Sequence, residues 1–258
     1  MRALITGAGN MGRAIRSALE ARGDEVVAMV GRATPRPSAA ELASPDVAFE
    51  FSHDSTLLDH VDLAIEAGCR ALVIGTTGWS TDGPTGRALA ERLEAAEARA
   101  VIAPTFSLGA VLFAELAEQA ARLFGDFSEY DPFVFEQHRR AKADRPSGTA
   151  LAIAQRLIPH LHAKREARLA DGPGAPDPDV LEVVALRAGS HPGMHVVGFD
   201  GPGEALELRI TARDRSAYVA GALLAADTLL AEPGRRGITT FSHLVRERTA
   251  RHQTDLDH

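Results

Sequence analysis

Cysteine is nearly absent from this sequence, since Cys69 is the only one among 258 residues. A single cysteine excludes an intramolecular disulfide and any metal site built from several thiolates. Long apolar runs are missing too, and no stretch approaches the roughly 18 residues that a membrane-spanning helix needs. The first residues enter a strand-like segment directly, so no secretory leader is expected. We therefore expect a soluble, cytoplasmic protein without a membrane partner.

Lysine is almost as scarce as cysteine. The 28 basic residues comprise 26 arginines and only two lysines, Lys142 and Lys164. The formal net charge of −7 disfavours a nucleic-acid partner recognised through bulk positive charge. Lys164 stands in no motif and is expected to be a surface charge. Lys142 falls in the densest group of polar residues in the chain.

The remaining composition is typical of a globular protein, with 45% hydrophobic and 24% charged residues. Up to about residue 104, strand-like and helix-like segments alternate, which is the order of a parallel, doubly wound sheet. Strands are expected over 3–6, 25–30, 47–51, 71–74 and 100–103, and helices over 11–21, 56–67 and 89–98. We predict an α/β fold with a Rossmann-type domain.

The pattern changes after residue 104. Helices are expected over 110–124, 149–161 and 217–230, and strands over 131–136, 180–186, 195–199 and 205–212. Glycine-containing turns separate the later strands, which favours a mixed or antiparallel sheet. We predict a dinucleotide-binding domain from residues 1–104 and 217–258. A separate α+β domain is expected over 105–216.

A glycine-rich loop lies between the first strand and the first helix. Gly7-Ala8-Gly9-Asn10-Met11-Gly12 fits Gly-x-Gly-x-x-Gly, in which glycines permit a tight turn and close approach of a pyrophosphate to backbone N–H groups. In this context the loop indicates dinucleotide binding rather than an ordinary turn. The second strand ends without the carboxylate that holds the ribose of NAD. Arg32, with Arg36 nearby, could instead pair with a 2′-phosphate, which favours NADPH and leaves NADH possible, although solvated loop arginines are almost as plausible.

The stretch from Glu136 to Ala150 holds a titratable histidine and a lysine four residues apart, at His138 and Lys142. Pro146-Ser147-Gly148-Thr149 then opens a helix whose free N–H groups and hydroxyls suit an anion. Such a segment can bind a carboxylate and deliver a proton, but a solvated basic loop before a capped helix has the same composition.

This stretch resembles the signature of the 4-hydroxy-tetrahydrodipicolinate reductases, also called dihydrodipicolinate reductases, Glu-x-His-His-Arg-x-Lys-x-Asp-x-Pro-Ser-Gly-Thr-Ala. Four further segments resemble the family in the same order, so the resemblance spans essentially the whole chain. They are Gly7–Gly12, 73–78, 103–109, and a late-sheet segment from Arg187 through His195 to Glu204. The glycine loop lacks the family's usual Gly-Arg before Met11.

The resemblance implies hydride transfer from a nicotinamide to a cyclic, imine-type dicarboxylate in lysine and diaminopimelate biosynthesis, and a homotetramer. It also implies that the domain over 105–216 binds the substrate and forms the oligomer. His138 and Lys142 would supply the proton, with Arg139, Ser147, Gly148 and Thr149 holding the substrate. The cofactor would contact Gly7, Ala8, Gly9, Asn10, Met11, Gly12, Arg32, Gly75, Thr76, Thr77, Ala103, Pro104, Thr105 and Phe106. No metal is expected, and His195 matches a family histidine that we expect to be structural.

Two positions depart from the family pattern. Arg139 replaces the second histidine of the His-His pair, and Thr105 replaces an asparagine. An arginine beside His138 would offer a fork for a carboxylate and bias His138 toward its neutral form. These departures leave open a reductase of the same fold that acts on another cyclic imine or enamine acid. A dinucleotide-binding sensor without catalysis is a weaker alternative, because the His138 and Lys142 pair would have no use in it.

Overall fold

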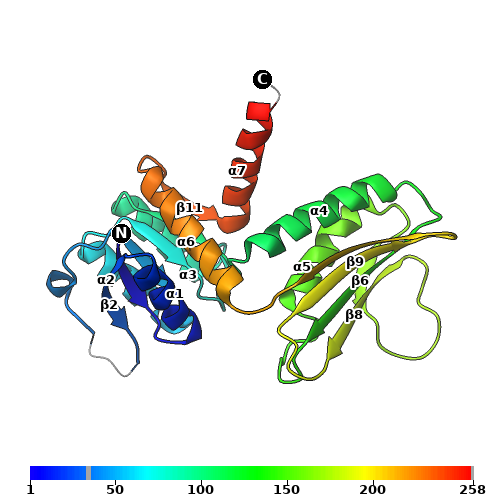
Figure 1. The fold of residues 1–258 in the computed structure, drawn as a ribbon, viewed down its shortest axis with the longest axis horizontal. Helices are drawn as coiled ribbons and strands as arrows, with labels where there is room; N and C mark the ends of the chain where they lie inside the picture. The colour runs from blue at the N-terminus through cyan, green and yellow to red at the C-terminus, as the bar shows by residue number, and fades with distance from the viewer. Residues whose placement is uncertain (33–35, 257–258) are drawn as a thin grey trace. The chain divides into compact units, whose positions relative to one another are not determined.

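The structure is a computed structural model that describes residues 1–32 and 36–256, with side chains described through residue 250. The chain forms two compact units (Figure 1). One unit comprises Met1–Leu108 together with the chain from Arg215 onward, and the other comprises Gly109–Asp214. The roles predicted for the two units remain predictions. Among the described residues, no helix combines the length and the apolar character needed to cross a membrane.

The first unit contains a parallel sheet in the order β11-β5-β4-β3-β1-β2. Its strands are β1 (Arg2–Thr6), β2 (Glu25–Val30), β3 (Val47–Glu50), β4 (Ala71–Ile74), β5 (Arg99–Ile102) and β11 (Gly237–Thr240). The strand order reverses between β1 and β3, because the chain proceeds outward from β1 to β2 and then returns to the other side. In doubly wound sheets, this point at the carboxyl ends of the strands is where ligands bind.

Helices cover both faces of that sheet. They are α1 (Asn10–Ala21), α2 (Asp54–Glu66), α3 (Pro84–Ala95), α6 (Ser216–Ala231) and α7 (Phe241–Leu256), with a short 3₁₀ turn, η1 (Ala39–Leu42). Helix α1 packs with α6, and α2 packs with α3. Every residue of β3, β4 and β5 is buried, as expected of parallel strands covered on both sides. The predicted Rossmann-type fold is confirmed.

The second unit contains a mixed sheet in the order β10-β9-β6-β8-β7. Its elements are α4 (Leu108–Phe124), β6 (Asp131–His138), α5 (Gly148–Leu157), η2 (Ile158–His160), β7 (Glu166–Leu169), β8 (Val180–Arg187), β9 (Met194–Asp200) and β10 (Ala205–Thr211). Strand β6 is parallel to β8 and antiparallel to β9. Helices α4 and α5 lie over one face of this sheet (Figure 1), with an apolar core between them that includes Val134, Ile153 and Val197. The predicted mixed sheet is confirmed.

The structure differs from the expected local structure at several places. Helix α3 begins at Pro84 rather than near residue 89, because proline is suited to the first turn of a helix. Strands β7 and β11 and helix α7 were not predicted, since Glu166–Leu169 and Gly237–Thr240 are short and partly polar and offer no clear periodicity. The expectation that Lys164 is a surface charge is wrong. Its side chain is buried, and Nζ lies 2.6 Å from Oδ1 of Asp131 and donates to the carbonyl of Pro178 at 2.9 Å.

Candidate active site

The predicted cofactor loops of the first unit follow strands β1, β4 and β5. Because these strands are parallel, their carboxyl ends lie at the same edge of the sheet, and backbone hydrogen bonds join the neighbouring ends. The N–H of Phe51 donates to the carbonyl of Thr6 at 2.8 Å, and the N–H of Gly75 donates to that of Glu50 at 2.8 Å. The loops at Gly7–Gly12, Gly75–Thr77 and Ala103–Phe106 therefore share one edge.

The three glycines of the first loop have different steric surroundings. Gly7 has φ +109°, and a Cβ added there would lie 2.1 Å from the carbonyl oxygen of Phe51. A Cβ on Gly12 would lie 1.8 Å from the carbonyl oxygen of Gly7. Gly9 is exposed, with no atom within 4 Å of an added Cβ. Gly7 and Gly12 thus permit the close turn, whereas Gly9 leaves the outer side of the loop open at the start of α1, where a pyrophosphate fits.

The loops after β4 and β5 are held by groups that sequence reasoning did not select. The hydroxyl of Thr76 accepts a hydrogen bond from the N–H of Ser52 at 2.8 Å, and the indole of Trp79 donates to the Thr76 carbonyl at 2.8 Å. The buried ring of Phe106 lies 5.7 Å, centroid to centroid, from that of Phe51. Phe51 and Ser52 follow β3 directly, so their position after a buried strand was the signal that could have found them.

Among the predicted cofactor contacts that follow β2, β4 and β5, the residues Arg32, Thr77 and Pro104 are exposed, and Thr105 is half-buried. Arg32 follows β2, whereas the guanidinium of Arg36 donates to the carbonyl of Asp59 at 2.7 Å. Of the two arginines named for a 2′-phosphate, Arg36 therefore already has a partner within the protein.

In the second unit, strand β6 ends at His138 and places Glu136 on the same face, because side chains two apart in a strand point the same way. A turn follows in which the N–H of Lys142 donates to the carbonyl of Arg139 at 3.0 Å. The Lys142 ammonium lies 2.6 Å from Oδ1 of Asp144. The side chain of Arg139 is exposed. His138 and Lys142 thus belong to one short segment at the end of β6.

The start of α5 provides the other predicted substrate residues. The hydroxyl of Ser147 accepts from the N–H of Ala150 at 3.2 Å and so caps the helix. Ser147 is buried, Gly148 is exposed and Thr149 is half-buried. The Ser147 hydroxyl therefore caps the helix, while the backbone N–H of Gly148 donates to the carboxylate of Asp144 and Thr149 remains half-buried beside it in the chain.

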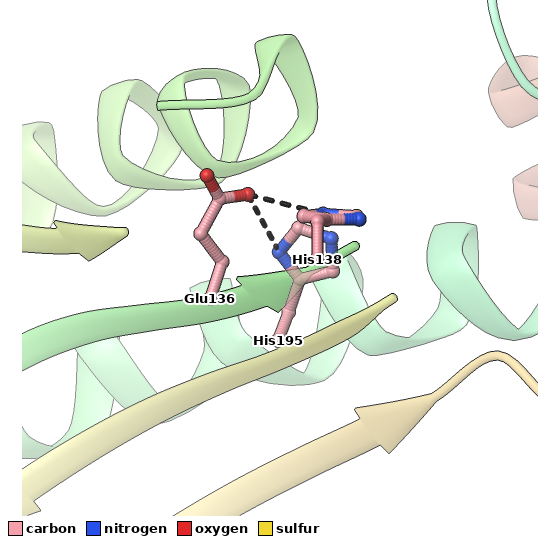
Figure 2. A group of neighbouring side chains, drawn as sticks. All are labelled: Glu136, His138 and His195. Atoms are coloured by element: carbon pink, nitrogen blue, oxygen red, sulfur yellow. Dashed lines mark ion pairs between the residues drawn. The ribbon is translucent and has the colours of Figure 1, made fainter. Parts of the chain in front are cut away.

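Glu136 connects these two segments with the neighbouring strands, and Figure 2 shows its carboxylate directed at His138 and His195. Its Oε1 accepts from the N–H of Ser147 at 2.8 Å and from the guanidinium of Arg187 at 2.8 Å. Its Oε2 lies 3.2 Å from Nε2 of His138 and 3.9 Å from Nδ1 of His195. His195 is the β9 residue opposite Glu136, and Arg187 is the β8 residue opposite His138.

Burial largely sets the protonation of this cluster. It lowers the pKa of His138, with Lys142 and Arg187 acting in the same direction and Glu136 against them. Arg139 is not among these main causes, although we expected it to bias His138 toward its neutral form. Burial also lowers the pKa of His195, to about 4. Burial opposes ionisation of Glu136, but hydrogen bonds from Ser147 and Arg187 hold the pKa of this carboxyl below its usual range. At neutral pH the cluster thus holds an anionic Glu136 between a cation and two neutral histidines.

One oxygen of Glu136 and a ring nitrogen each of His138 and His195 lie within 4.8 Å of one another. This spacing alone would be compatible with a bound cation. However, the guanidinium of Arg187 already neutralises the same carboxylate. We therefore interpret the three side chains as a cluster of titratable groups rather than a metal site, and the absence of a metal remains a prediction.

Two family models match the chain almost end to end. The model described as dihydrodipicolinate reductase, N-terminus, matches residues 1–106, and the model described as dihydrodipicolinate reductase, C-terminus, matches residues 109–245. A 4-hydroxy-tetrahydrodipicolinate reductase of Methanopyrus kandleri is 38% identical, over 78% of this chain and 71% of the relative. One of Alkalilimnicola ehrlichii is 36% identical, over 90% of this chain and 95% of the relative.

Among solved structures, the fold is similar to that of a dipicolinate-bound dihydrodipicolinate reductase from Paenisporosarcina sp. TG-14. The TM-score is 0.73 at 21% identity, covering 93% of this chain and 97% of that one. At this identity the likeness concerns the fold.

Proposed function

This chain belongs to the dihydrodipicolinate reductase family, and from that premise we propose that it reduces 4-hydroxy-tetrahydrodipicolinate to tetrahydrodipicolinate in lysine and diaminopimelate biosynthesis. The family makes the protein an NAD(P)H-dependent oxidoreductase that acts on a cyclic substrate. The observation that supports the substrate best is the segment from His138 to Thr149. It joins a histidine and a lysine to a helix start with an exposed glycine, Gly148.

The cofactor we propose is NADPH, with NADH as the alternative. When bound, the nicotinamide supplies the hydride. The backbone of Gly7–Gly12 would hold the pyrophosphate, since no atom lies within 4 Å of a Cβ placed on Gly9. Arg32 would pair with a 2′-phosphate, which is supported by its exposure and by the absence of a carboxylate at the end of β2. Gly75–Thr77 and Ala103–Phe106 would contact the nicotinamide half.

The substrate would lie against the exposed residues at the end of β6 and the start of α5. Gly148 and Thr149 would hold one carboxylate through N–H groups and a hydroxyl, and Arg139 would hold the other as a planar fork. Reduction places a hydride on one atom and requires a proton at another, so His138 and Lys142 would deliver that proton. The hydrogen bond from Lys142 lowers the pKa of Asp144. The Asp144 carboxylate therefore stays ionised and holds the Lys142 ammonium in place.

Another cyclic imine or enamine acid remains the alternative substrate. Two observations favour considering it: the replacement of a family histidine by Arg139, and Thr105, whose hydroxyl accepts from the N–H of Ser107 at 3.4 Å rather than offering an amide. We also propose a homo-oligomer formed through the sheet of the second unit. Val184 and Leu186 of β8 are exposed there, which supports this proposal.

The test follows the loss of NADPH or NADH absorbance with enzymatically generated 4-hydroxy-tetrahydrodipicolinate. We expect turnover with NADPH, and a fall in kcat of about 100-fold or more in His138→Gln and in Lys142→Ala, which is the usual contribution of a positioned acid. Thermal unfolding of each variant controls for misfolding. Cofactor binding without turnover on this substrate, but with turnover on another cyclic imine acid, would favour the alternative.

A further inference from the structure

The two oxygens of Glu136 have different surroundings. Oε1 accepts two hydrogen bonds, one from the Ser147 N–H and one from Arg187. Oε2 is buried without a hydrogen bond of good geometry, and so is Nε2 of His138, which lies 3.2 Å from it. A buried carboxylate oxygen without a donor is costly, so its placement beside a histidine nitrogen needs a reason.

The ring of His138 lies between two acceptors. Besides Glu136 Oε2, the backbone carbonyl of Pro192 accepts a hydrogen bond from this ring. A neutral imidazole has one N–H and can serve only one acceptor, whereas an imidazolium has two. Both acceptors therefore face an N–H group only when the His138 ring is an imidazolium, with a proton on each nitrogen.

We propose that Glu136 is a positioning residue for the reduction: it holds the His138 ring through Nε2 and stabilises the protonated ring that delivers the proton. This inference rests on the proposed function. It assigns Glu136 no contact with substrate, since its side chain is fully buried. Arg187 and the Ser147 N–H act on the other oxygen and keep Oε2 directed at His138.

The charged and titratable groups around His138 are Glu136 from its own strand, Arg187 from β8, His195 from β9 and Lys142 from the turn after β6. Among these, Glu136 is the anion. Burial, Arg187 and Lys142 all lower the pKa of His138, and the Glu136 carboxylate opposes them together with the hydrogen bond to the Pro192 carbonyl. A substrate with two carboxylates would act in the same direction as Glu136 when it binds.

The decisive variant is Glu136→Gln. Its carbonyl oxygen can still accept from Ser147 and Arg187, while an NH₂ group replaces the charged oxygen beside His138. Because a protonated His138 is then less favourable, we expect its pKa to fall by about one unit or more, since removing an adjacent opposite charge has that size of effect. The basic limb of the kcat profile should move to lower pH by a similar amount, and KM should change less than kcat.

The matched control is Glu118→Gln in α4. Glu118 pairs with Arg156 and Arg122, and hydrogen bonds from these arginines hold its pKa at about 2 against the effect of burial. This variant loses a strongly paired carboxylate in the same unit and is expected to keep the wild-type pH profile.

Nuclear magnetic resonance titration of His138 in the wild-type chain and in Glu136→Gln provides a readout that needs no substrate. If the wild-type enzyme is active, an unchanged His138 pKa or an unchanged pH profile of kcat in Glu136→Gln would overturn the inference. If the wild-type enzyme itself fails to turn over, the proposed function fails, while the titration still decides whether Glu136 controls the proton on His138.

Discussion

At the scale of single residues, His195 shows how burial can set a charge state. It lies near the start of β9 opposite Glu136, and burial lowers its pKa to about 4, with Lys142 and Arg187 acting in the same direction. In the unfolded chain a histidine takes up its proton near pH 6.5. Between these values the unfolded state binds more protons than the folded state, so stability contributed by this group is complete above pH 6.5 and is lost as the pH falls toward 4.

We therefore predict that His195→Gln reduces the pH dependence of stability. From pH 7 to pH 5, the wild-type free energy of unfolding should fall by about 2 kcal/mol through this residue, and the variant should lack that part of the fall. Urea unfolding at both pH values measures it. His162→Gln is the control, because that side chain is 73% exposed beside Asp126. Equal pH slopes in wild type and His195→Gln would contradict the prediction.

At the scale of elements, the turn from β1 to α1 contains one glycine that the fold requires and another that it does not. Gly12 has no room for a Cβ because the carbonyl oxygen of Gly7 lies 1.8 Å from the position it would take. Gly9 has no such neighbour and has φ −76°, which any residue adopts. A glycine at position 9 is thus not required by the protein itself.

Gly12→Ala and Gly9→Ala should consequently behave differently. We expect Gly12→Ala to lose about 1–3 kcal/mol or more of stability, the usual cost of overpacking. Gly9→Ala should keep wild-type stability but bind NADPH at least several-fold more weakly, because its methyl group occupies the approach of the pyrophosphate. Thermal unfolding and calorimetric titration with NADPH test the pair. Wild-type cofactor affinity in a folded Gly9→Ala would place the pyrophosphate elsewhere.

The glycine pattern and the alternation of strands and helices were sufficient to predict the first sheet except for its edge strand β11, because both are local features of the sequence. The motif from Glu136 to Ala150 likewise located the end of β6 and the start of α5. The pairing of Glu136 with His195 and Arg187 was not predictable in the same way. It depends on the register of β6 against β9 and β8, which joins residues about 50 to 60 positions apart. Lys164 was mispredicted because its acidic partner, Asp131, is also distant in the chain.

At the scale of the whole molecule, the scarcity of lysine becomes an experimental advantage. The two lysines differ in access: the Lys142 side chain is 26% exposed, whereas that of Lys164 is 6% exposed. Lys164 is also held by Asp131 and the Pro178 carbonyl. Arginine does not react with amine-directed acylating reagents under mild conditions, because its guanidinium keeps its proton. Apart from the α-amino group, the protein therefore offers such a reagent one accessible amine.

We predict that mild acetylation modifies Lys142 first and removes reductase activity in proportion to its occupancy. Acetylation abolishes the positive charge and the proton that the proposed mechanism assigns to this side chain. Intact-mass and peptide mass spectrometry, read against residual turnover, measure both quantities on the same sample. Lys142→Arg is the matched control. It keeps the charge and is expected to show little turnover, because arginine does not release its proton at working pH, and it should lack the fast-reacting lysine. Activity that survives full acetylation of Lys142, or high turnover in Lys142→Arg, would show that the proton comes from His138 without it.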